Sequence, residues 1–166
     1  MYNSVYYNPL PEEFDLVYCH FPDRRRLPSV PLLEDLIPYN DPHYCMVLGL
    51  VEGNDDIIVV YGTSKIKSPK PCDFILEKKD LAGTGLIVDT KWSFTPSNIA
   101  ILPYNKTYFS IKNSSLPTVG KFPESKKEDL LKIINHNNVQ NILNDLYDSP
   151  YAMLPEKYWD LEKYKV

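Results

Sequence analysis

Asp56-Asp-Ile-Ile-Val-Val-Tyr-Gly-Thr-Ser64 decides the fold of this chain. Residues 57–60 are four consecutive β-branched residues. Such side chains pack well on a pleated surface and are too stiff about χ1 to favour a helix, so the run predicts a buried strand. The strand leads into Gly62, Thr63 and Ser64. Two interpretations of this end are open. It is an ordinary turn, which hydroxyl residues often begin, or a binding rim where glycine admits a ligand and the hydroxyls offer hydrogen bonds.

A turn signal precedes this strand. Gly53-Asn54-Asp55 separates residues 56–61 from a second aliphatic strand pattern at residues 43–51. This arrangement predicts an antiparallel hairpin. In such a hairpin the start of one strand lies beside the end of the other, so we expect His43 close to the two hydroxyl residues.

Four further strand patterns complete the expected sheet. They lie at residues 15–21, 73–76, 85–94 and 99–102, whereas residues 104–123 look irregular. The turns between them are rich in Gly, Pro, Asn and Asp, and no strand alternates with a helix. About six short strands in this order predict a mainly β fold, a small closed or half-closed β-barrel.

Helical patterns begin only near the end of the chain. Ser125 and Glu128 have the spacing of a capping box, a hydroxyl at the N-cap and a glutamate three residues later. Apolar residues recur at helical spacing in residues 130–134 and again in residues 139–146. Asn135-His-Asn-Asn138 interrupts the pattern. We expect one broken helix or two short helices packed on the barrel.

Length and composition fit one domain. The chain has 166 residues, 43% of them hydrophobic, which allows a substantial core. We expect the domain at residues 14–146, an N-terminal arm at 1–13 and a C-terminal tail at 147–166 packed on it. The net charge of -4 argues against a non-specific nucleic-acid binder but is compatible with a local basic patch. A membrane span needs about 18 apolar residues in a row, and no such run or signal-peptide pattern occurs, so the cytoplasm is the expected location.

Cysteines and histidines argue against metal and disulfide chemistry. Cys19, Cys45 and Cys72 are odd in number, and no pair has CxxC spacing. Cys19 and Cys45 fall in apolar strand patterns, which predicts that they are small buried hydrophobic residues. The three histidines lack the i, i+4 spacing of a helical metal site. We therefore expect no metal, disulfide framework or cofactor.

Two basic loops provide candidate phosphate contacts. The first is a long, proline-rich connection at residues 22–42, which contains three consecutive arginines; the second follows the organising strand. A connection of this length is usually functional or a cover over the body. A solvated turn and a phosphate contact are both open, because guanidinium groups bind phosphate with two parallel hydrogen bonds. The candidate phosphate-binding residues are Arg24, Arg25, Arg26, Lys65 and Lys67.

Five segments occur in an order known from one protein family. Residues 14–23 form a hydrophobic strand that ends in an aromatic residue and a proline, and residues 43–48 form an aliphatic strand. Residues 59–64 lead into a Thr-Ser pair. Residues 85–92 form a Gly-aliphatic stretch that runs into Thr-Lys, and residues 119–123 form a glycine-containing step into the last helices. In these segments the chain resembles the MazF/PemK family of toxin endoribonucleases.

This resemblance implies a fold and a reaction. The family has an SH3-like β-barrel with a C-terminal helix and cleaves single-stranded RNA without a metal. The 2′-hydroxyl of the RNA attacks the phosphate, an arginine stabilises the charged intermediate, and a Thr or Ser supports it. Thr63, with Ser64, matches the hydroxyl position. The resemblance also implies an antitoxin partner and a homodimer, or a monomer if the two terminal segments cover the dimer surface.

The chain departs from the family at the arginine. His43 or Asp41 occupies that position, and no arginine follows Arg26. His43 could replace it as a general acid or base, since an unperturbed imidazole titrates near neutrality, or it is simply a surface residue. An arginine of the 22–42 connection could reach the site, or that connection could occlude it. The candidate catalytic residues are Thr63, Ser64 and His43. The alternative to an endoribonuclease is an inactive PemK-like binding module for protein or nucleic acid, of phage or mobile-element origin.

Overall fold

Two antiparallel β-sheets and two short helices make up the computed structural model, which describes residues 5–23, 36–112, 114–154 and 158. The mainly β prediction is confirmed. The strands of the described residues are β1 (Asp15–Cys19), β2 (His43–Leu50), β3 (Asp56–Val60), β4 (Gly62–Thr63), β5 (Asp73–Leu76), β6 (Thr90–Ser93), β7 (Ile99–Pro103) and β8 (Thr118–Lys121). The helices are α1 (Lys127–His136) and α2 (Val139–Tyr147). Short 3-10 turns lie at Lys78–Asp80, Pro96–Asn98 and Glu124–Lys126.

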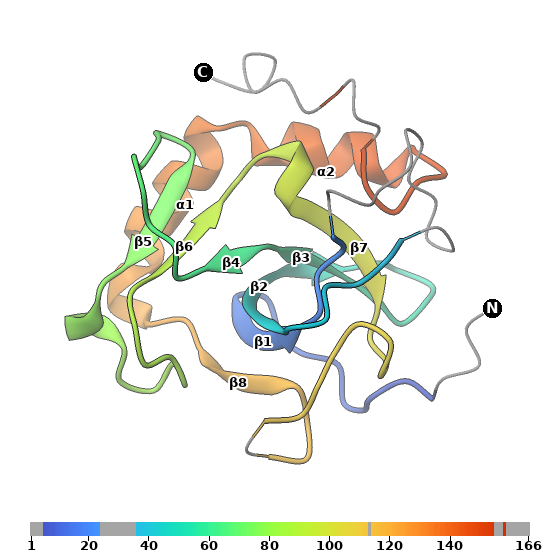
Figure 1. The fold of residues 1–166 in the computed structure, drawn as a ribbon. Helices are drawn as coiled ribbons and strands as arrows, with labels where there is room; N and C mark the ends of the chain where they lie inside the picture. The colour runs from blue at the N-terminus through green and yellow to red at the C-terminus, as the bar shows by residue number, and fades with distance from the viewer. Residues whose placement is uncertain (1–4, 24–35, 113, 155–157, 159–166) are drawn as a thin grey trace.

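The larger sheet has the strand order β7-β3-β2-β1-β8, and the smaller has the order β4-β6-β5 (Figure 1). The predicted hairpin is confirmed: β2 and β3 pair antiparallel, with Met46 opposite Val60 and Val47 opposite Val59. All four β-branched residues of β3 are fully buried, because cores lie on both faces of the larger sheet. Ile58 belongs to one core and Ile57 to the other. A strand buried on both faces reads as a continuous apolar run, which is what the sequence shows.

The chain passes from one sheet to the other at Gly62. Tyr61 follows the end of β3, and β4 then pairs with β6, with Gly62 opposite Trp92. The indole Nε1 of Trp92 donates a 3.1 Å hydrogen bond to the main-chain oxygen of Tyr44 in β2. A Cβ atom on Gly62 would lie 1.8 Å from that oxygen. Glycine is therefore the residue that lets the two sheets approach here.

Two predictions about the later strands were wrong. In the expected strand at 85–94, only Thr90–Ser93 is extended and paired. Gly85 has φ +78°, and the amide of Leu86 donates to the side chain of Thr84, so the chain turns away from a strand: Leu86 is buried, whereas Ile87 and Val88 lie in an exposed loop. Residues 118–121, expected to be irregular, form β8 and pair with β1. The pairing of β8 depends on a strand about a hundred residues earlier, which local sequence does not reveal.

Strand ends also differ from the expected ones. The first strand ends at Cys19 instead of residue 21, where Pro22 forms a bridge with Pro38 outside the sheet. The second ends at Leu50 and the third at Val60, each one residue early. The strands at 73–76 and 99–102 were correctly placed, the latter extending by one residue.

The predicted helical interruption is confirmed as two short helices. α1 ends at His136, and Asn138 has the left-handed φ of +53° before α2 begins. The predicted capping box was wrong. Ser125 lies in a 3-10 turn, and the N-cap of α1 is Lys126, without a side-chain cap bond. The turn starts after Pro123, whose oxygen accepts the amide of Lys126 at 3.0 Å.

The chain before β1 and after α2 packs against the β7 side of the larger sheet. Tyr7 donates its amide to the oxygen of Tyr104 at 2.8 Å, and the hydroxyl of Tyr6 donates to Asp56 at 2.9 Å. The amide of Ile101 in β7 donates to the oxygen of Ala152 at 2.8 Å. Residues 155–157 and 159–166 of the expected tail lie outside the described residues, as do residues 24–35 of the long connection at 22–42.

Neither helix in the described part of the chain has the length and apolar character that a bilayer span requires. The three cysteine thiols are free and buried, as the strand patterns of Cys19 and Cys45 predicted. Burial raises the pKa of the Cys19 thiol well above its usual value, and a hydrogen bond with Cys45 adds to this.

Candidate functional site

His43 begins β2 and lies in a group of aromatic rings. Its ring centroid is 5.0 Å from that of Tyr61 and 5.5 Å from that of Tyr39. Tyr61 is the residue between β3 and β4, so the hairpin brings His43 to the segment that carries Thr63. The rings of Phe21 and Tyr61 are 5.3 Å apart and extend the group.

The surroundings of His43 lower the pKa of its imidazole from the usual value. Burial is the main cause that lowers its pKa, and the nearby charge of Lys65 and the ring of His20 lower it further. The nearby main-chain oxygen and the carboxylate charge of Asp41 act in the opposite direction and raise this pKa. The Nδ1 atom is buried and has no hydrogen-bond partner among the described residues. A buried ring nitrogen without a partner is costly unless a ligand or substrate uses it.

Thr63 lies in β4 with its side chain on the outer face of the smaller sheet. It is half-buried, and its Oγ1 accepts the amide of Lys65 at 3.1 Å. The hydroxyl therefore shapes the turn that follows and still has its own proton to donate. Ser64, Lys65 and Lys67 are exposed. The turn interpretation is confirmed for Thr63, while the binding interpretation stays a prediction, since the hydroxyl that accepts this hydrogen bond can also donate one.

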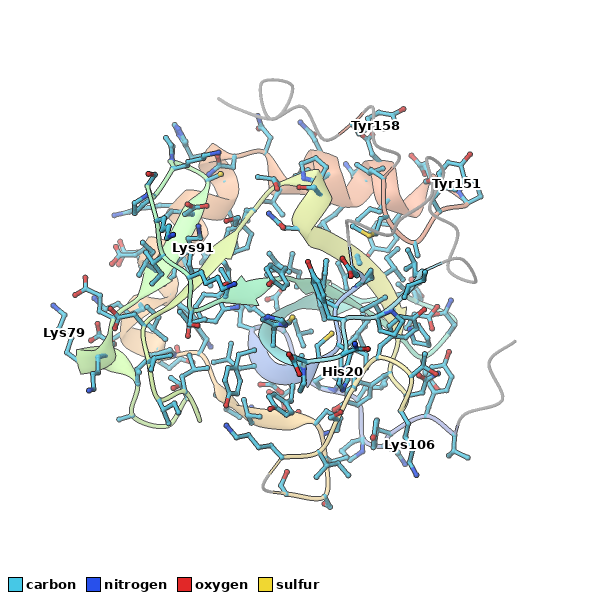
Figure 2. The ribbon with its side chains drawn as sticks, viewed as in Figure 1. His20, Lys79, Lys91, Lys106, Tyr151 and Tyr158 are labelled. Carbon is cyan, nitrogen blue, oxygen red and sulfur yellow. The ribbon has the colours of Figure 1, made fainter. Side chains whose placement is uncertain are left out.

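Lys91 was not identified from the sequence as a site residue. It is the cross-strand partner of Thr63, and such partners point to the same face of an antiparallel sheet. Its ammonium is 3.7 Å from a carboxylate oxygen of Asp73, and its side chain is only 15% exposed. Asp73 also accepts hydrogen bonds from the hydroxyl of Ser93 and the amide of Lys70. Figure 2 shows Lys91 on the smaller sheet, well apart from His20.

A second group that the sequence did not reveal lies at the start of β2, on the opposite face of the larger sheet from the ring of His43. Tyr18 of β1 and Tyr44 of β2 are cross-strand partners with ring centroids 5.4 Å apart. The ammonium of Lys112 lies 5.5 Å from the first ring centroid and 4.7 Å from the second, and it donates to the hydroxyl of Tyr44. That hydrogen bond is the main cause that raises the pKa of Lys112. An ammonium above two tyrosines offers one charge and two ring surfaces to a ligand.

The structure brings only some of the candidate residues together. His43, Thr63, Ser64 and Lys65 lie around the link between β3 and β4, and Lys67 follows them in an exposed loop. Arg24, Arg25 and Arg26 lie outside the described residues. In the described ranges, no group of three or more His, Cys, Asp or Glu side chains is arranged to hold a metal ion.

The chain was compared with models of protein families and with curated proteins. No family model matches it, and no curated protein matches it. The function therefore has to be argued from the site itself.

Proposed function

We propose that this chain is a PemK/MazF-like endoribonuclease, an SH3-like barrel that binds single-stranded RNA and cleaves it without a metal. One observation carries the proposal: the ring of His43, whose buried Nδ1 forms no hydrogen bond within the described residues, lies 5.0 Å from the ring of Tyr61, two residues before Thr63. A proton acceptor, a hydroxyl donor and the cations Lys65 and Lys91 thus surround one short segment. The junction at Gly62 supports a barrel, because it joins the two sheets along β2 and β4. A cytoplasmic location belongs to this proposal.

His43 is the proton acceptor of the reaction. A neutral imidazole takes the proton from the 2′-hydroxyl, which then forms a bond to the adjacent phosphorus. The bond from phosphorus to the 5′-oxygen breaks, and that oxygen leaves with the proton returned by the imidazolium. The products are a 2′,3′-cyclic phosphate and a 5′-hydroxyl, and no electron donor or metal takes part.

Thr63 and two lysines take the position of the missing family arginine. The hydroxyl of Thr63 donates to a non-bridging phosphate oxygen, and the ammonium groups of Lys65 and Lys91 stabilise its developing charge. An ammonium is a single point charge and lacks the two parallel hydrogen bonds of a guanidinium. Asp73 neutralises part of the charge of Lys91 at 3.7 Å. We therefore expect slow cleavage compared with an arginine-containing site.

Tyr18, Tyr44 and Lys112 lie on the opposite face of the larger sheet from His43 and hold bases farther along the bound RNA, beyond the cleaved phosphate. Single-stranded RNA binds proteins through bases stacked on aromatic rings and through backbone contacts to cations. These three side chains supply both, next to the start of β2. The net charge of -4 makes this local arrangement, and not the charge of the whole chain, the source of RNA affinity.

An inactive binding module is the second candidate. The ion pair between Lys91 and Asp73 favours it, since a cation already paired with a carboxylate stabilises a phosphate less. In this case the same surface holds RNA or an antitoxin-like protein without reaction. The family resemblance leaves two quaternary states open, a homodimer and a monomer. Light scattering at two protein concentrations distinguishes them.

Cleavage of a labelled single-stranded RNA in EDTA tests the proposal. We expect products that end in 2′,3′-cyclic phosphate, with rates roughly 10²- to 10⁴-fold lower for His43→Ala, as is typical of a lost general base. Thr63→Ala and Lys91→Ala should also slow cleavage. Lys79→Ala, at an exposed lysine of the 3-10 turn Lys78–Asp80, serves as a matched control and should cleave like the wild type (Figure 2). Intact RNA at high protein concentration would exclude the enzyme, and retained RNA binding in that case would favour the binding module.

A further inference from the structure

A groove on another part of the molecule runs between α1 and the chain segment that leads into β1. It consists of two adjoining hollows of about 310 and 260 Å³, which share Glu13 and Phe14 as lining residues. Lys127, Leu131 and Asn135 of α1 line its opposite wall. Their spacing of four residues places them on one face of the helix, so the wall extends along most of α1.

The two halves of the groove differ in chemistry. One half has an aliphatic floor that includes Leu48, Ile134 and Leu143, and Leu131 at its edge is 43% exposed. Asn135, Asn138 and Asn141 surround this floor. Within the described residues, no hydrogen bond is formed by the side chains of these three asparagines. A primary amide both donates and accepts, so this rim matches the alternating N–H and C=O groups of a peptide backbone.

The other half is acidic. Glu12, Glu13, Asp15 and Glu124 line it together with Lys121 and Lys127. The two lysines are already paired: Lys121 with Glu12 and Asp15, and Lys127 with Glu124. Glu13, where the two halves meet, forms no ion pair within the described residues. The groove therefore has an excess of negative charge beside an aliphatic floor, which excludes RNA as its ligand on electrostatic grounds.

Phe14, which lines both halves of the groove, has a strained backbone. Its φ is +67°, a conformation that is rare for a bulky residue. The strain is maintained by two hydrogen bonds: its amide donates to Val47 at 2.7 Å, and its oxygen accepts from Phe122 at 3.4 Å. Such outliers persist where the surrounding structure imposes them and concentrate at functional sites.

We propose that this groove binds a short extended segment of a partner protein, with a Lys or Arg on the acidic half and aliphatic side chains on the other. The Lys or Arg of the partner segment pairs with the negative charge of Glu13. The aliphatic side chains of the segment pack on the floor around Leu131. Eight residues of α1 span about 12 Å, which equals about four residues of an extended peptide. Alternate side chains of such a segment point to the same side, so every second residue faces the groove.

Binding of the peptide acetyl-Arg-Ser-Leu-Ser-Leu-amide to the ¹⁵N-labelled full chain tests the inference. We expect amide shifts to change along residues 12–15 and 131–141, and not around His43. Acetyl-Glu-Ser-Leu-Ser-Leu-amide should bind more weakly. Glu13→Lys should weaken binding of the basic peptide roughly fivefold and reverse the preference between the two peptides, as expected for an exposed charge pair. Leu131→Asp should weaken it by about tenfold or more, since it removes apolar contact.

Matched controls separate binding from folding. Glu52→Lys and Ile87→Asp make the same kinds of change at exposed positions elsewhere and should bind the basic peptide like the wild type. Equal affinity for the two peptides, or shifts that survive Leu131→Asp, would overturn the inference. So would concentration-dependent dimerisation that Leu131→Asp abolishes, because the occupant would then be a second copy, or groove shifts caused by RNA. His43→Ala should bind the peptide normally, so the result is independent of the proposed cleavage.

Discussion

Trp92 donates its indole N–H to the main-chain oxygen of Tyr44 at 3.1 Å. This hydrogen bond connects β6 of the smaller sheet to β2 of the larger one, directly beside the face of Gly62. The neighbours of Tyr44 on either side belong to the candidate site or the core: His43 to the aromatic group and Cys45 to a buried cluster. The contact that joins the two sheets therefore also fixes the position of the candidate site.

Gly62→Ala should destabilise the protein by more than about 3 kcal/mol, because its Cβ would lie 1.8 Å from the Tyr44 oxygen and 2.7 Å from Trp92 Nε1. The backbone atom cannot move without separating the two sheets. Urea denaturation followed by tryptophan fluorescence measures the loss. Gly49→Ala is the control, since its Cβ would meet nothing closer than Ile58 at 4.0 Å. Equal stability of the two variants would show that the sheets can separate at little cost.

Ser125→Ala tests the helix start that the sequence misplaced. A serine at a true N-cap is worth about 1 kcal/mol, whereas Ser125 lies within a 3-10 turn and α1 has no side-chain cap bond. We therefore expect a change in the free energy of unfolding below about 0.5 kcal/mol, typical of a surface position. A loss near 1 kcal/mol would show that Ser125 caps the helix as the sequence predicted.

Local sequence predicted the secondary structure correctly where a segment is buried on both faces or where a residue clearly interrupts a helical pattern. Residues 57–60 read as a strand because both of their faces are covered, and Asn138 ended the helical pattern because asparagine tolerates a left-handed φ. Local sequence did not predict a strand whose pairing partner lies far away in the chain. β8 contains Gly120 and forms only by pairing with β1, and the loop at 85–89 exposes an apolar pair that looked like a strand. Propensity gives way to tertiary context at such positions.

The candidate site likewise contains residues that local sequence could identify and residues that it could not. Thr63 and His43 could be selected because a strand end and a hairpin are local features. Lys91 and the Tyr18–Tyr44 pair could not, since each depends on the register between strands far apart in the chain. The alternation of Trp92 with its neighbours was the available signal: an inward tryptophan places the residue before it on the outer face.

Tyr6→Phe should lower stability at neutral pH by about 1 kcal/mol, the usual worth of one hydrogen bond, because Tyr6 donates to Asp56 at 2.9 Å. Burial and that hydrogen bond raise the pKa of Tyr6 to about 12 from 10.0. A raised pKa favours the protonated phenol in the folded state. Its contribution is therefore complete below pH 10 and is lost as the pH rises toward 12. The stabilities of wild type and variant should converge over this range. Tyr147→Phe, which removes only an exposed 3.3 Å hydrogen bond to the Leu50 oxygen, should cost less stability at neutral pH than Tyr6→Phe.

Acid should destabilise the protein through His43. Burial lowers the pKa of this imidazole from 6.5, so the unfolded chain takes up the proton first as the pH falls below that value. Stability linked to His43 is present above pH 6.5 and declines below it until the folded imidazole is also protonated. Chemical denaturation at pH 7.5 and at a series of lower pH values measures the free energy of unfolding. This free energy should fall more steeply with decreasing pH for the wild type than for His43→Gln. His136→Gln, at an exposed histidine, should keep the wild-type slope. Parallel curves for wild type and His43→Gln would contradict the assigned burial effect.

Tyr18→Leu should weaken binding of a single-stranded RNA about tenfold, because stacking of one base on an aromatic ring contributes about 1–3 kcal/mol. Leucine keeps an apolar side chain beside Tyr44 and removes the ring surface beneath Lys112. Fluorescence anisotropy at fixed salt measures the affinity, with Tyr147→Leu as the matched substitution at an exposed tyrosine of α2. Lys112→Ala should weaken binding and also reduce its salt dependence, since one phosphate contact is lost. If Tyr18→Leu binds RNA like Tyr147→Leu, the paired tyrosines do not hold the bases, and RNA contact would have to centre on Thr63 and Lys65.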